Sequence, residues 1–485
     1  MAHKRKRRSL GATTLLAALT LLLSLSFCFA ACTFIDRLTG PKDSTIPPDI
    51  SLSDPVDQDK DNEPDTPETT TQPGESNVPT QSVPEGELGQ VVSSATISSQ
   101  GDLLMHKPII ECSYKGGMYD FEAVFRYLKS YTTGFDYAVA NLETTFGGEG
   151  FVYQGNPQFN CPDSFINYVS DAGYDMLLTA NNHAVDTLAG GISRTLEIVR
   201  GKGITTLGTH LDDTEKKYEV VEVNGIKIGM VCFTYAYSHD GSKFSLNGLA
   251  PIPDVGAVNF FMNDNLDKLY TEAQQHMDSM KAEGADVTMF YIHWGTEYQT
   301  TENSTQNKIA QRLCDMGFDV IVGGHAHVVQ PVELLQSTVD PEHRTVCIYS
   351  MGNAVSNQRT GVSSLFPAGY TEDGALFTVT FEKYANGEVF LADADVMPTW
   401  VNMHSNNGTK EYNILPLEKA REGEWKSMFQ MTDGQLSSAK KSYDRTMGIV
   451  GEGLAECREY LSTQKAAREG TQPTMASYPS YANAA

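Results

Sequence analysis

The chain has 485 residues and a formal net charge of −25. A nucleic-acid partner requires a basic face on the protein, so we expect none for a chain this acidic. The length leaves room for a targeting segment, a linker and one large domain or two smaller ones.

The first 31 residues have the pattern of a targeting segment. Basic residues at positions 4–8 precede an apolar stretch from Leu10 to Phe29, and small residues connect this stretch to Cys32. We predict a signal peptide over residues 1–31, and its ending resembles a bacterial lipoprotein signal in which Cys32 is lipidated. An uncleaved membrane anchor is the alternative, because the apolar stretch approaches the roughly 20 residues that span a bilayer. Both interpretations predict an extracytoplasmic protein anchored to the bacterial cell membrane.

Residues 32–93 are predicted to form a disordered acidic linker rich in Pro, Thr and Ser. Nine of the 21 prolines fall between Asp36 and Glu87, and the segment has almost no apolar residue to bury. Such a composition cannot offset the entropy lost on folding. We therefore expect a tether that holds the following domain away from the membrane.

From Val91 onward, strand-like and helix-like stretches alternate. Expected strands cover residues 95–105, 137–140, 176–179, 287–292, 320–322 and 346–349, and expected helices cover 121–130, 191–202, 266–283 and 308–316. Asn224-Gly225 and Asn386-Gly387 each separate two strand-like stretches, at 218–223 and 226–233 and at 375–384 and 389–396, which predicts two hairpins. This order predicts parallel β-α-β units with added antiparallel strands, in two sheets with helices outside them. After Leu417 the chain becomes polar and helical, and its last residues are expected to be frayed.

The cysteines indicate no thiolate metal site, because the sequence has no Cys-x-x-Cys spacing. Cys112 and Cys161 have polar neighbours and could form a disulfide in an oxidising compartment. Cys232 and Cys347 lie in apolar stretches and are expected to be buried free thiols.

Polar side chains recur just after the expected strands, where α/β folds build their sites. They are Asp102, Asn141, Glu143, Asn181, Asn182, His183, His293, His325 and His327. Each has a plain structural explanation on its own, since Asp102 could be a turn residue and His293 a buried, hydrogen-bonded histidine. His325 and His327 are harder to explain, because residues at i and i+2 leave a strand on the same side and the preceding glycines allow close backbone approach. One metal centre would explain the whole set, and its mixture of imidazole, carboxylate and carboxamide groups suits Zn, Mn or Fe.

The same segments are similar to the successive motifs of the CapA family. They are Gly101–His106, Asn141–Glu143, Ala180–Asp186, His293–Tyr298, Gly324–Gln330 and Ser350–Asn353. CapA proteins are associated with poly-γ-glutamate capsule synthesis and export, and they resemble calcineurin-type metallophosphoesterases. The resemblance extends from about Thr96 to Leu417. It implies an α/β fold, a four-layer α-β-β-α sandwich with mixed sheets, over residues 94–418, followed by a polar helical C-terminal extension with a disordered tail over 419–485.

The resemblance also implies roles for single residues. A divalent transition metal, as one or two ions of Mn, Fe or Zn, would be held by Asp102, Glu143, Asn182, His293, His325 and His327, with Glu143 as the bridging carboxylate. His183 would be the unligated acid that protonates a leaving group. Four further groups would be ligands or supports of ligands, namely His106, Asn141, Asp186 and Glu297.

Two departures from the metallophosphoesterase pattern bear on the first metal position. Leu104 stands where that pattern has a histidine, and Asn141-Leu142-Glu143 replaces its second aspartate motif. His106 could substitute for the missing histidine if the first strand continues that far. One metal position is therefore expected to be weak or absent.

Two functions remain open from the sequence. The first is a metal-dependent hydrolase or transferase that takes part in the synthesis, export or processing of capsule or poly-γ-glutamate. The second is a non-catalytic component that binds the polymer or holds an export complex together through a degenerate metal site. The expected partners are an anionic envelope polymer or its precursor and capsule synthesis or export proteins in the membrane.

Overall fold

The computed structural model describes residues 88–238, 243–248, 250–252, 255–366, 368–406 and 408–471. The predicted signal peptide, Cys32, most of the predicted linker and residues 472–485 lie outside these ranges. Strand β1 begins at Val91, so regular structure starts within the last residues assigned to the linker. Among the described residues, no helix has the length and apolar composition needed to cross a membrane.

The first sheet combines parallel and antiparallel strands in the order β19-β18-β17-β1-β4-β5-β6, with β16 paired to β1. The strands β1, β4, β5, β6 and β16 are parallel, and β17, β18 and β19 continue the sheet in antiparallel fashion. Their bounds are β1 Val91–Leu103, β4 Tyr137–Asn141, β5 Met176–Leu178, β6 Thr205–Leu207, β16 Asn353–Val355, β17 Asp373–Tyr384, β18 Val389–Asn406 and β19 Thr409–Pro416. The second predicted hairpin is thus the pair β17–β18.

The second sheet has the order β10-β9-β8-β12-β13-β15-β14, and β7 and β11 also pair with β8. Its centre is the parallel set β8, β12, β13 and β15, and the antiparallel pair β7–β8 is the first predicted hairpin. The bounds are β7 Glu219–Val223, β8 Ile226–Ser238, β9 Phe244–Leu246, β10 Ala250–Pro251, β11 Phe260–Met262, β12 Val287–His293, β13 Val320–Gly324, β14 Val332–Gln336 and β15 Arg344–Ile348. All of β12 is buried, as expected for a central parallel strand covered on both faces.

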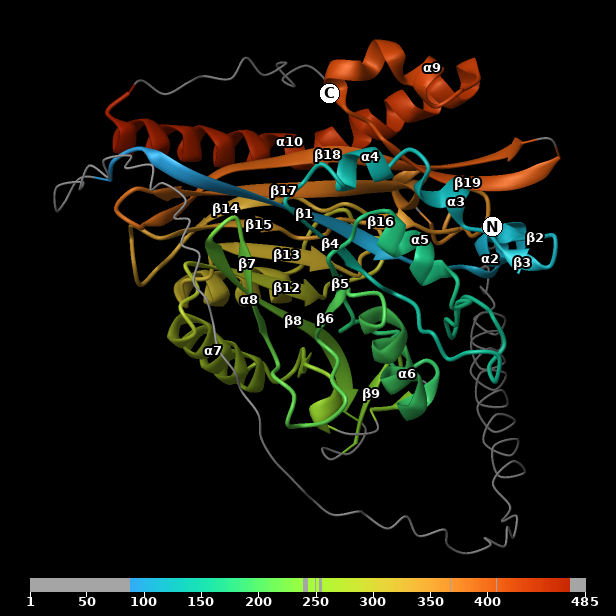
Figure 1. Ribbon diagram of the computed structural model, residues 1–485, viewed down its shortest axis with the longest axis horizontal. Helices are drawn as coiled ribbons and strands as arrows, with labels where there is room; N and C mark the ends of the chain where they lie inside the picture. Colours follow the sequence, from blue (N-terminus) through green and yellow to red (C-terminus); the bar gives the residue numbers. More distant parts are fainter. Residues whose placement is uncertain are drawn as a thin grey trace, which may run out of the picture. The chain divides into compact units, whose positions relative to one another are not determined.

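Helices cover the outer faces of both sheets (Figure 1). Their bounds are α2 Lys107–Ser113, α3 Glu122–Phe125, α4 Lys129–Thr132, α5 Phe165–Asp171, α6 Leu188–Arg200, α7 Asp267–Ala282, α8 Ser304–Asp315, α9 Trp425–Met428 and α10 Asp433–Glu469. Short 3-10 turns occupy Val255–Ala257, Tyr370–Glu372 and Lys419–Glu424, and Tyr114–Lys115 pairs with Met118–Tyr119 as the β2–β3 ribbon. Helix α8 begins at a capping box made by Asn303 and Gln306.

Three apolar cores separate four layers. The central core lies between the sheets, where Ile97 and Met176 of the first sheet belong to one cluster with Met289 and Val322 of the second. A second core joins the outer face of the first sheet to α2, α3 and α5. A third joins the outer face of the second sheet to α7 and α8. The predicted four-layer α-β-β-α sandwich with mixed sheets is therefore confirmed.

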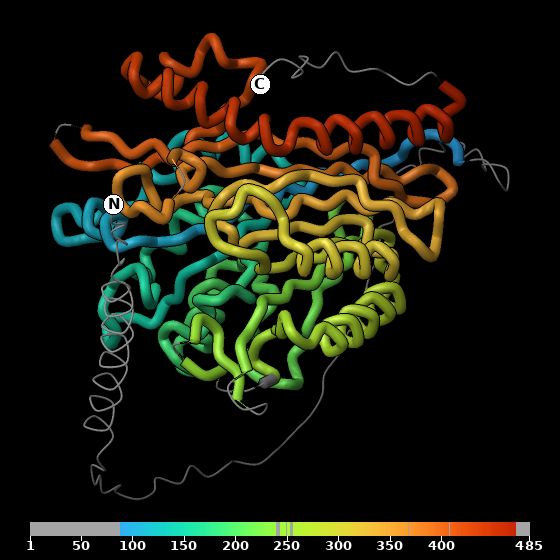
Figure 2. Tube along the Cα trace, turned by 180° about the vertical axis from the view of Figure 1, so that it is seen from behind, coloured from blue at the N-terminus to red at the C-terminus, as the bar shows by residue number. Residues whose placement is uncertain are grey.

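Helix α10, in the predicted helical C-terminal extension, packs against both sheets. It runs along β17 and β18 of the first sheet and also contacts β14 of the second (Figures 1 and 2). Tyr443, Val450 and Leu454 on its inner face are buried in the central core. The helix begins at a capping box of Thr432 and Gln435 and ends at Gly470 in the left-handed conformation.

One predicted helix is wrong. Residues 121–130 form two short helices, α3 and α4, separated by a turn in which the Leu128 amide donates to the Phe125 carbonyl, three residues back. Phe125 and Leu128 still face the second core. The apolar spacing is the same for a continuous and for a broken helix, so the pattern could not reveal the break.

Candidate metal centre

The predicted site residues meet at the carboxyl ends of the parallel strands of both sheets. Asp102 is near the end of β1, Glu143 follows β4 and Asn182 follows β5. From the opposite sheet, His293 ends β12, and His325 follows β13. These five side chains and His327 have at most 4 % of their surface exposed, so the site is a buried polar cluster between the sheets.

The segment after β13 reaches the site through an unusual backbone. His325 and His327 have φ angles of 89° and 56°, in the left-handed region that residues with a side chain seldom adopt. They were expected to leave a strand on one side, but β13 ends at Gly324 and these two left-handed residues turn the histidines toward the site. The expected close approach at the glycines is present, because a Cβ on Gly323 would lie 2.0 Å from the Tyr349 carbonyl oxygen. Strained backbone of this kind is typical of functional sites.

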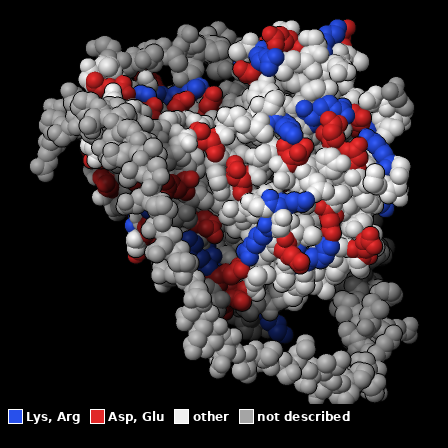
Figure 3. Space-filling model, viewed as in Figure 1, with Lys and Arg blue, Asp and Glu red and all other residues white. Residues whose placement is uncertain are grey.

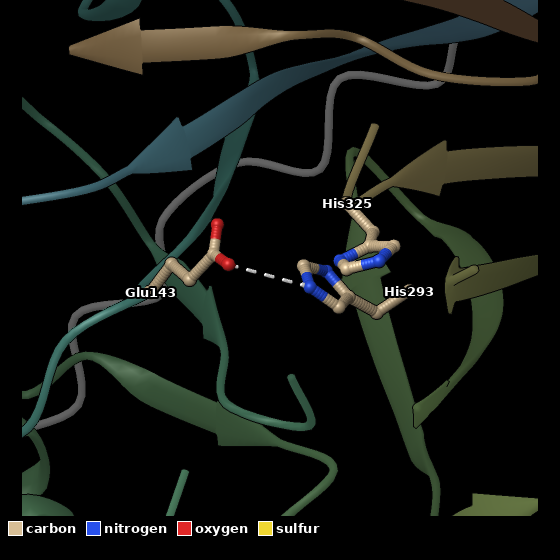
Figure 4. A group of neighbouring side chains, drawn as sticks. All are labelled: Glu143, His293 and His325. Carbon is tan, nitrogen blue, oxygen red and sulfur yellow. Dashed lines mark ion pairs between the residues drawn. The ribbon is translucent and has the colours of Figure 1, made fainter. Parts of the chain in front are cut away.

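Two groups of side chains in the described residues have the spacing of metal ligands, and they share Glu143. One group is Glu143, His293 and His325, and the other is Asp102, Glu143 and His327. Figure 4 shows Glu143 and His293 pointing toward each other, with His325 beside them, and Glu143 Oε1 is 3.5 Å from His293 Nε2. Glu143 is thus located where a bridging carboxylate would be.

Several buried polar atoms of these groups lack a hydrogen-bond partner among the described residues. They are both carboxylate oxygens of Glu143 and the Nδ1 atom of His325. Buried polar atoms are almost always paired, and an unmade bond costs about 1–3 kcal/mol. A bound cation would satisfy all three atoms, so the residues present fit a divalent metal.

Direct contacts hold the other donors in place. The Asn182 Oδ1 atom is 2.7 Å from His293 Nε2, and the Asp102 Oδ2 atom is 3.2 Å from His327 Nδ1. Asn141 donates to Asp102 Oδ1 at 2.7 Å and accepts from the Asn181 amide. Asn141 therefore orients Asp102, which is one of the two roles predicted for it.

His183 lies beside the groups and is paired with a carboxylate. Its Nδ1 atom is 2.7 Å from Asp186 Oδ2, and Asp186 in turn accepts from the Phe159 amide at 2.6 Å. The His183 Nε2 atom is 4.0 Å from Glu143 Oε1, so this nitrogen faces the metal-ligand groups. Because a carboxylate only accepts hydrogen bonds, Asp186 holds the proton on Nδ1 and fixes the orientation of the ring.

Burial sets the charges of the cluster. Burial and the neighbouring charge of Asp102 raise the pKa of Glu143 well above its usual range. Burial also opposes ionisation of Asp102, but the hydrogen bonds of His327 and Asn141 and the charges of nearby histidines together outweigh it and lower the pKa of Asp102. Burial lowers the pKa of His293 to about 3 and that of His325 well below its usual range. Both imidazoles are therefore neutral near pH 7, the form that binds metals.

Two other predicted residues lie outside both groups. Strand β1 ends at Leu103, so His106 does not extend it but precedes α2, where its Nδ1 accepts from the Asn357 amide at 3.2 Å. Glu297 is exposed, and its charge contributes to the raised pKa of Glu143. Cys112 and Cys161, which could have formed a disulfide, are both free thiols.

Two asparagines at the site had not been assigned a role from the sequence. Asn247, in the loop after β9, accepts from the Asn182 amide at 2.8 Å, and its own amide nitrogen is 3.0 Å from His183 Nδ1. Asn353, the first residue of β16, has its Oδ1 atom 3.1 Å from His327 Nδ1. The motif Ser350–Asn353 was a signal for Asn353, but no sequence pattern singled out Asn247.

Comparison with known proteins matches the family model described as "Bacterial capsule synthesis protein PGA_cap" to residues 96–358. The chain is 25% identical to the PGA biosynthesis protein CapA of Bacillus subtilis, over 70% of this chain and 80% of that protein. It is 27% identical to the capsule biosynthesis protein CapA of Bacillus anthracis, over 62% of this chain and 66% of that protein. Among solved structures, the NAD nucleotidase of Haemophilus influenzae aligns with 11% identity and a TM-score of 0.38, over 78% of this chain and 68% of that one.

Proposed function

The chain belongs to the bacterial capsule synthesis protein family PGA_cap, and from this premise we propose that it acts in the synthesis, export or processing of a capsule polymer such as poly-γ-glutamate. We propose that it does so as a metal-dependent hydrolase or transferase. The observation that carries the proposal is the pair of ligand-spaced groups that share Glu143, beside the His183–Asp186 pair. The names of the two Bacillus relatives support the biological role.

The metal would be held by donors from both sheets. Asp102, Glu143 and His327 would form one position, and Glu143, Asn182, His293 and His325 the other. When bound, divalent cations in such a site supply Lewis acidity and lower the pKa of a water molecule. The orphaned atoms of Glu143 and His325 support binding at the position that those two residues share.

His183 is the proposed general acid. Asp186 keeps the proton on Nδ1, so Nε2 is the atom that faces the reacting centre and exchanges a proton with a leaving group. Phe159 packs edge-on against the His183 ring, with centroids 4.5 Å apart, and limits its rotation. A positioned proton donor of this kind contributes about 10²–10⁴-fold to a rate.

The proposed location is outside the cytoplasmic membrane, with Cys32 as the site of a lipid anchor. The proposed partners are an anionic envelope polymer or its precursor and the membrane proteins that make or export it. On the face in Figure 3, acidic and basic side chains are interspersed, and the whole chain carries a net charge of −25. Contact with a polyanion would therefore depend on the metal ions, which bind carboxylates directly.

A second candidate function is a non-catalytic component that binds polymer through a degenerate site. The observation that favours it is Leu104, a buried apolar residue where the metallophosphoesterase pattern has a histidine. Metal binding with no turnover in any assay would support this second function.

The test measures metal content and turnover of the purified full chain. We expect mass spectrometry to detect bound Mn, Fe or Zn, either in the purified protein or after one of these metals is added back. Hydrolysis of a chromogenic phosphodiester or of γ-glutamyl oligomers should depend on the bound metal. His183→Ala should reduce turnover by about 10²–10⁴-fold and leave the metal content unchanged. His404→Ala, which changes a histidine on β18 away from the site, is the matched control.

A chain that binds no transition metal would refute the enzymatic proposal. Loss of metal in His183→Ala would refute the role of His183 as an unligated acid.

A further inference from the structure

The metal position formed by Asp102, Glu143 and His327 is one donor short. In the metallophosphoesterase pattern a histidine would stand at the position of Leu104, which here is 1 % exposed and offers only an apolar side chain. The Leu104 backbone amide is already bonded to the Val355 carbonyl oxygen. A fourth donor at this position must therefore come from another segment.

Asn353 presents an amide oxygen at this place, and its orientation is determined by its other contacts. Its Nδ2 atom donates to the carbonyl oxygens of His327 and Thr371 and to Gln358 Oε1, at 3.0–3.1 Å. All three partners are hydrogen-bond acceptors, so the side-chain atom of Asn353 that faces them is the nitrogen Nδ2 and not the oxygen Oδ1. The oxygen consequently faces the metal-ligand groups, in a side chain that is 0 % exposed.

The distances around His327 Nδ1 are those of donors to one ion. Asn353 Oδ1 lies at 3.1 Å, Asp102 Oδ2 at 3.2 Å and Glu143 Oε2 at 3.9 Å from this nitrogen. Donors bonded to a first-row metal at about 2.1 Å are roughly 3–3.5 Å from each other. The Asn353 and Asp102 oxygens are thus already at donor-to-donor distance from His327 Nδ1, and Glu143 Oε2 would have to move closer to share a cation with them.

The backbone places Asn353 there. It is the register partner of Asp102 in the parallel pair of β1 and β16, and the Asp102 amide donates to the Gly352 carbonyl oxygen at 3.0 Å. A Cβ on Gly101 would lie 1.9 Å from that same oxygen, so glycine is required for the approach. The two side chains are thus fixed side by side.

We propose that Asn353 supplies the fourth donor of this position, in place of the missing imidazole. The position completed by Asn353 then has three oxygen donors and one nitrogen donor. The second position has two oxygen donors, from Glu143 and Asn182, and two imidazole nitrogens. Oxygen-rich sites suit harder ions, so the Asn353 position favours Mn²⁺, whereas the other position accepts Zn²⁺ or Fe²⁺ as well as Mn²⁺. This inference rests on the proposed metal-dependent function and names the ligand that completes it.

The experiment titrates the metal-free full chain with Mn²⁺ and follows free Mn²⁺ by electron paramagnetic resonance. Wild type is expected to bind two ions, and Asn353→Ala to keep one and to bind the other at least tenfold more weakly. Asn413→Ala removes an equally buried amide on β19, away from the site, and should bind like wild type. Adding Leu104→His to Asn353→Ala should restore the weakened position by returning an imidazole to it.

A second comparison separates a ligand from a residue that only orients His327. If Asn353 is a ligand, Asn353→Ala weakens Mn²⁺ binding further in a His327→Ala background. An unchanged affinity in that background overturns the inference. Should the alanine variant fail to fold, Asn353→Leu keeps a similar volume and removes the oxygen donor, so wild-type Mn²⁺ affinity in Asn353→Leu also overturns it.

The outcomes distinguish this inference from the proposed function. If Asn353→Ala binds both ions as tightly as wild type does, the role of Asn353 is overturned and the proposed function still stands. Wild type that binds no metal overturns both.

Discussion

Glu143 is the residue on which the candidate site depends. Its carboxylate is fully buried, belongs to both ligand-spaced groups and has no hydrogen-bond partner among the described residues. A buried acid without a partner destabilises the metal-free fold. The structure keeps it where a cation would offset that cost, which is typical of a site shaped for a ligand and not for stability alone.

His210 provides a residue-scale prediction away from the metal centre. It is buried after β6, its Nε2 is 3.1 Å from Asn259 Oδ1, and burial together with the charge of Lys217 lowers its pKa from 6.5 to about 4. Arg200 also disfavours its protonation, and Glu215 favours it. A pKa that is depressed in the folded state stabilises the fold above pH 6.5, and this contribution is lost as the pH falls toward 4.

We expect His210→Gln to flatten this pH dependence, because glutamine keeps an amide near Asn259 and does not titrate. Between pH 6.5 and about 4, the stability of wild type relative to the variant should fall by about 1.4 kcal/mol per pH unit. Urea unfolding of both proteins at pH 7 and pH 5 measures the difference. A difference that is independent of pH would contradict the burial of a neutral imidazole at this position.

The sequence indicated which residue types would meet at the site but not how the backbone brings them there. Histidine, asparagine and carboxylate after apolar strands predicted the ligand-spaced groups, because the carboxyl ends of parallel strands lie at one edge of a sheet. The left-handed conformations of His325 and His327 and the contact of Asn247 with Asn182 depend on partners far away in the chain. No local pattern encodes such contacts.

At the scale of elements, apolar periodicity located most of the strands and helices correctly. The two Asn-Gly hairpins and helices α7 and α8 lie where predicted, because each has a strong local signal. Strand β18 runs ten residues beyond the predicted Val396 and pairs with β19, which was not predicted. Pro398 is unfavourable inside a strand because proline has no backbone N–H, so the sequence pattern predicts that the strand ends there. The pairing of β18 with β17 on one side and β19 on the other keeps the strand extended.

Helix α10 was predicted as helical but not as part of the core. Its contacts with β14 depend on Gly453, where an added Cβ would lie 1.7 Å from the Val332 carbonyl oxygen. Gly453→Ala should therefore push the helix away from the strand and destabilise the protein by about 1–3 kcal/mol. Gly448→Ala, in the same helix, adds a methyl group that meets nothing within 4 Å.

The Gly448 variant is the matched control for this prediction. Alanine loses less backbone entropy than glycine on folding into a helix, so Gly448→Ala should stabilise the protein by about 0.5–1 kcal/mol. Denaturant unfolding of the two variants against wild type gives both values. Equal effects of the two substitutions would mean that α10 does not pack against β14 through Gly453.

At the scale of the whole molecule, the site joins the two sheets. Asp102, Glu143 and Asn182 come from the first sheet, whereas His293 and the two histidines after β13 come from the second. The apolar cluster between the sheets ends at these polar groups, which lie at the carboxyl ends of the parallel strands. A metal ion at this place would connect the sheets where their apolar packing stops.

Metal binding should therefore stabilise the whole fold. At a free Mn²⁺ concentration a hundredfold above the Kd, binding to the folded state alone adds about 2.7 kcal/mol. For a domain of this size we expect the Tm to rise by about 3–6 °C over the value in EDTA, measured by scanning calorimetry. Glu143→Gln replaces the shared carboxylate with a neutral amide that has one oxygen and cannot bridge two ions, so it should abolish most of this rise. The same variant replaces an unpartnered buried acid with a neutral amide, so in EDTA it should be at least as stable as wild type.

A Tm that rises equally in both proteins would show that the stabilising ion binds elsewhere. A variant that is less stable than wild type in EDTA would mean that Glu143 supports the fold and not the metal.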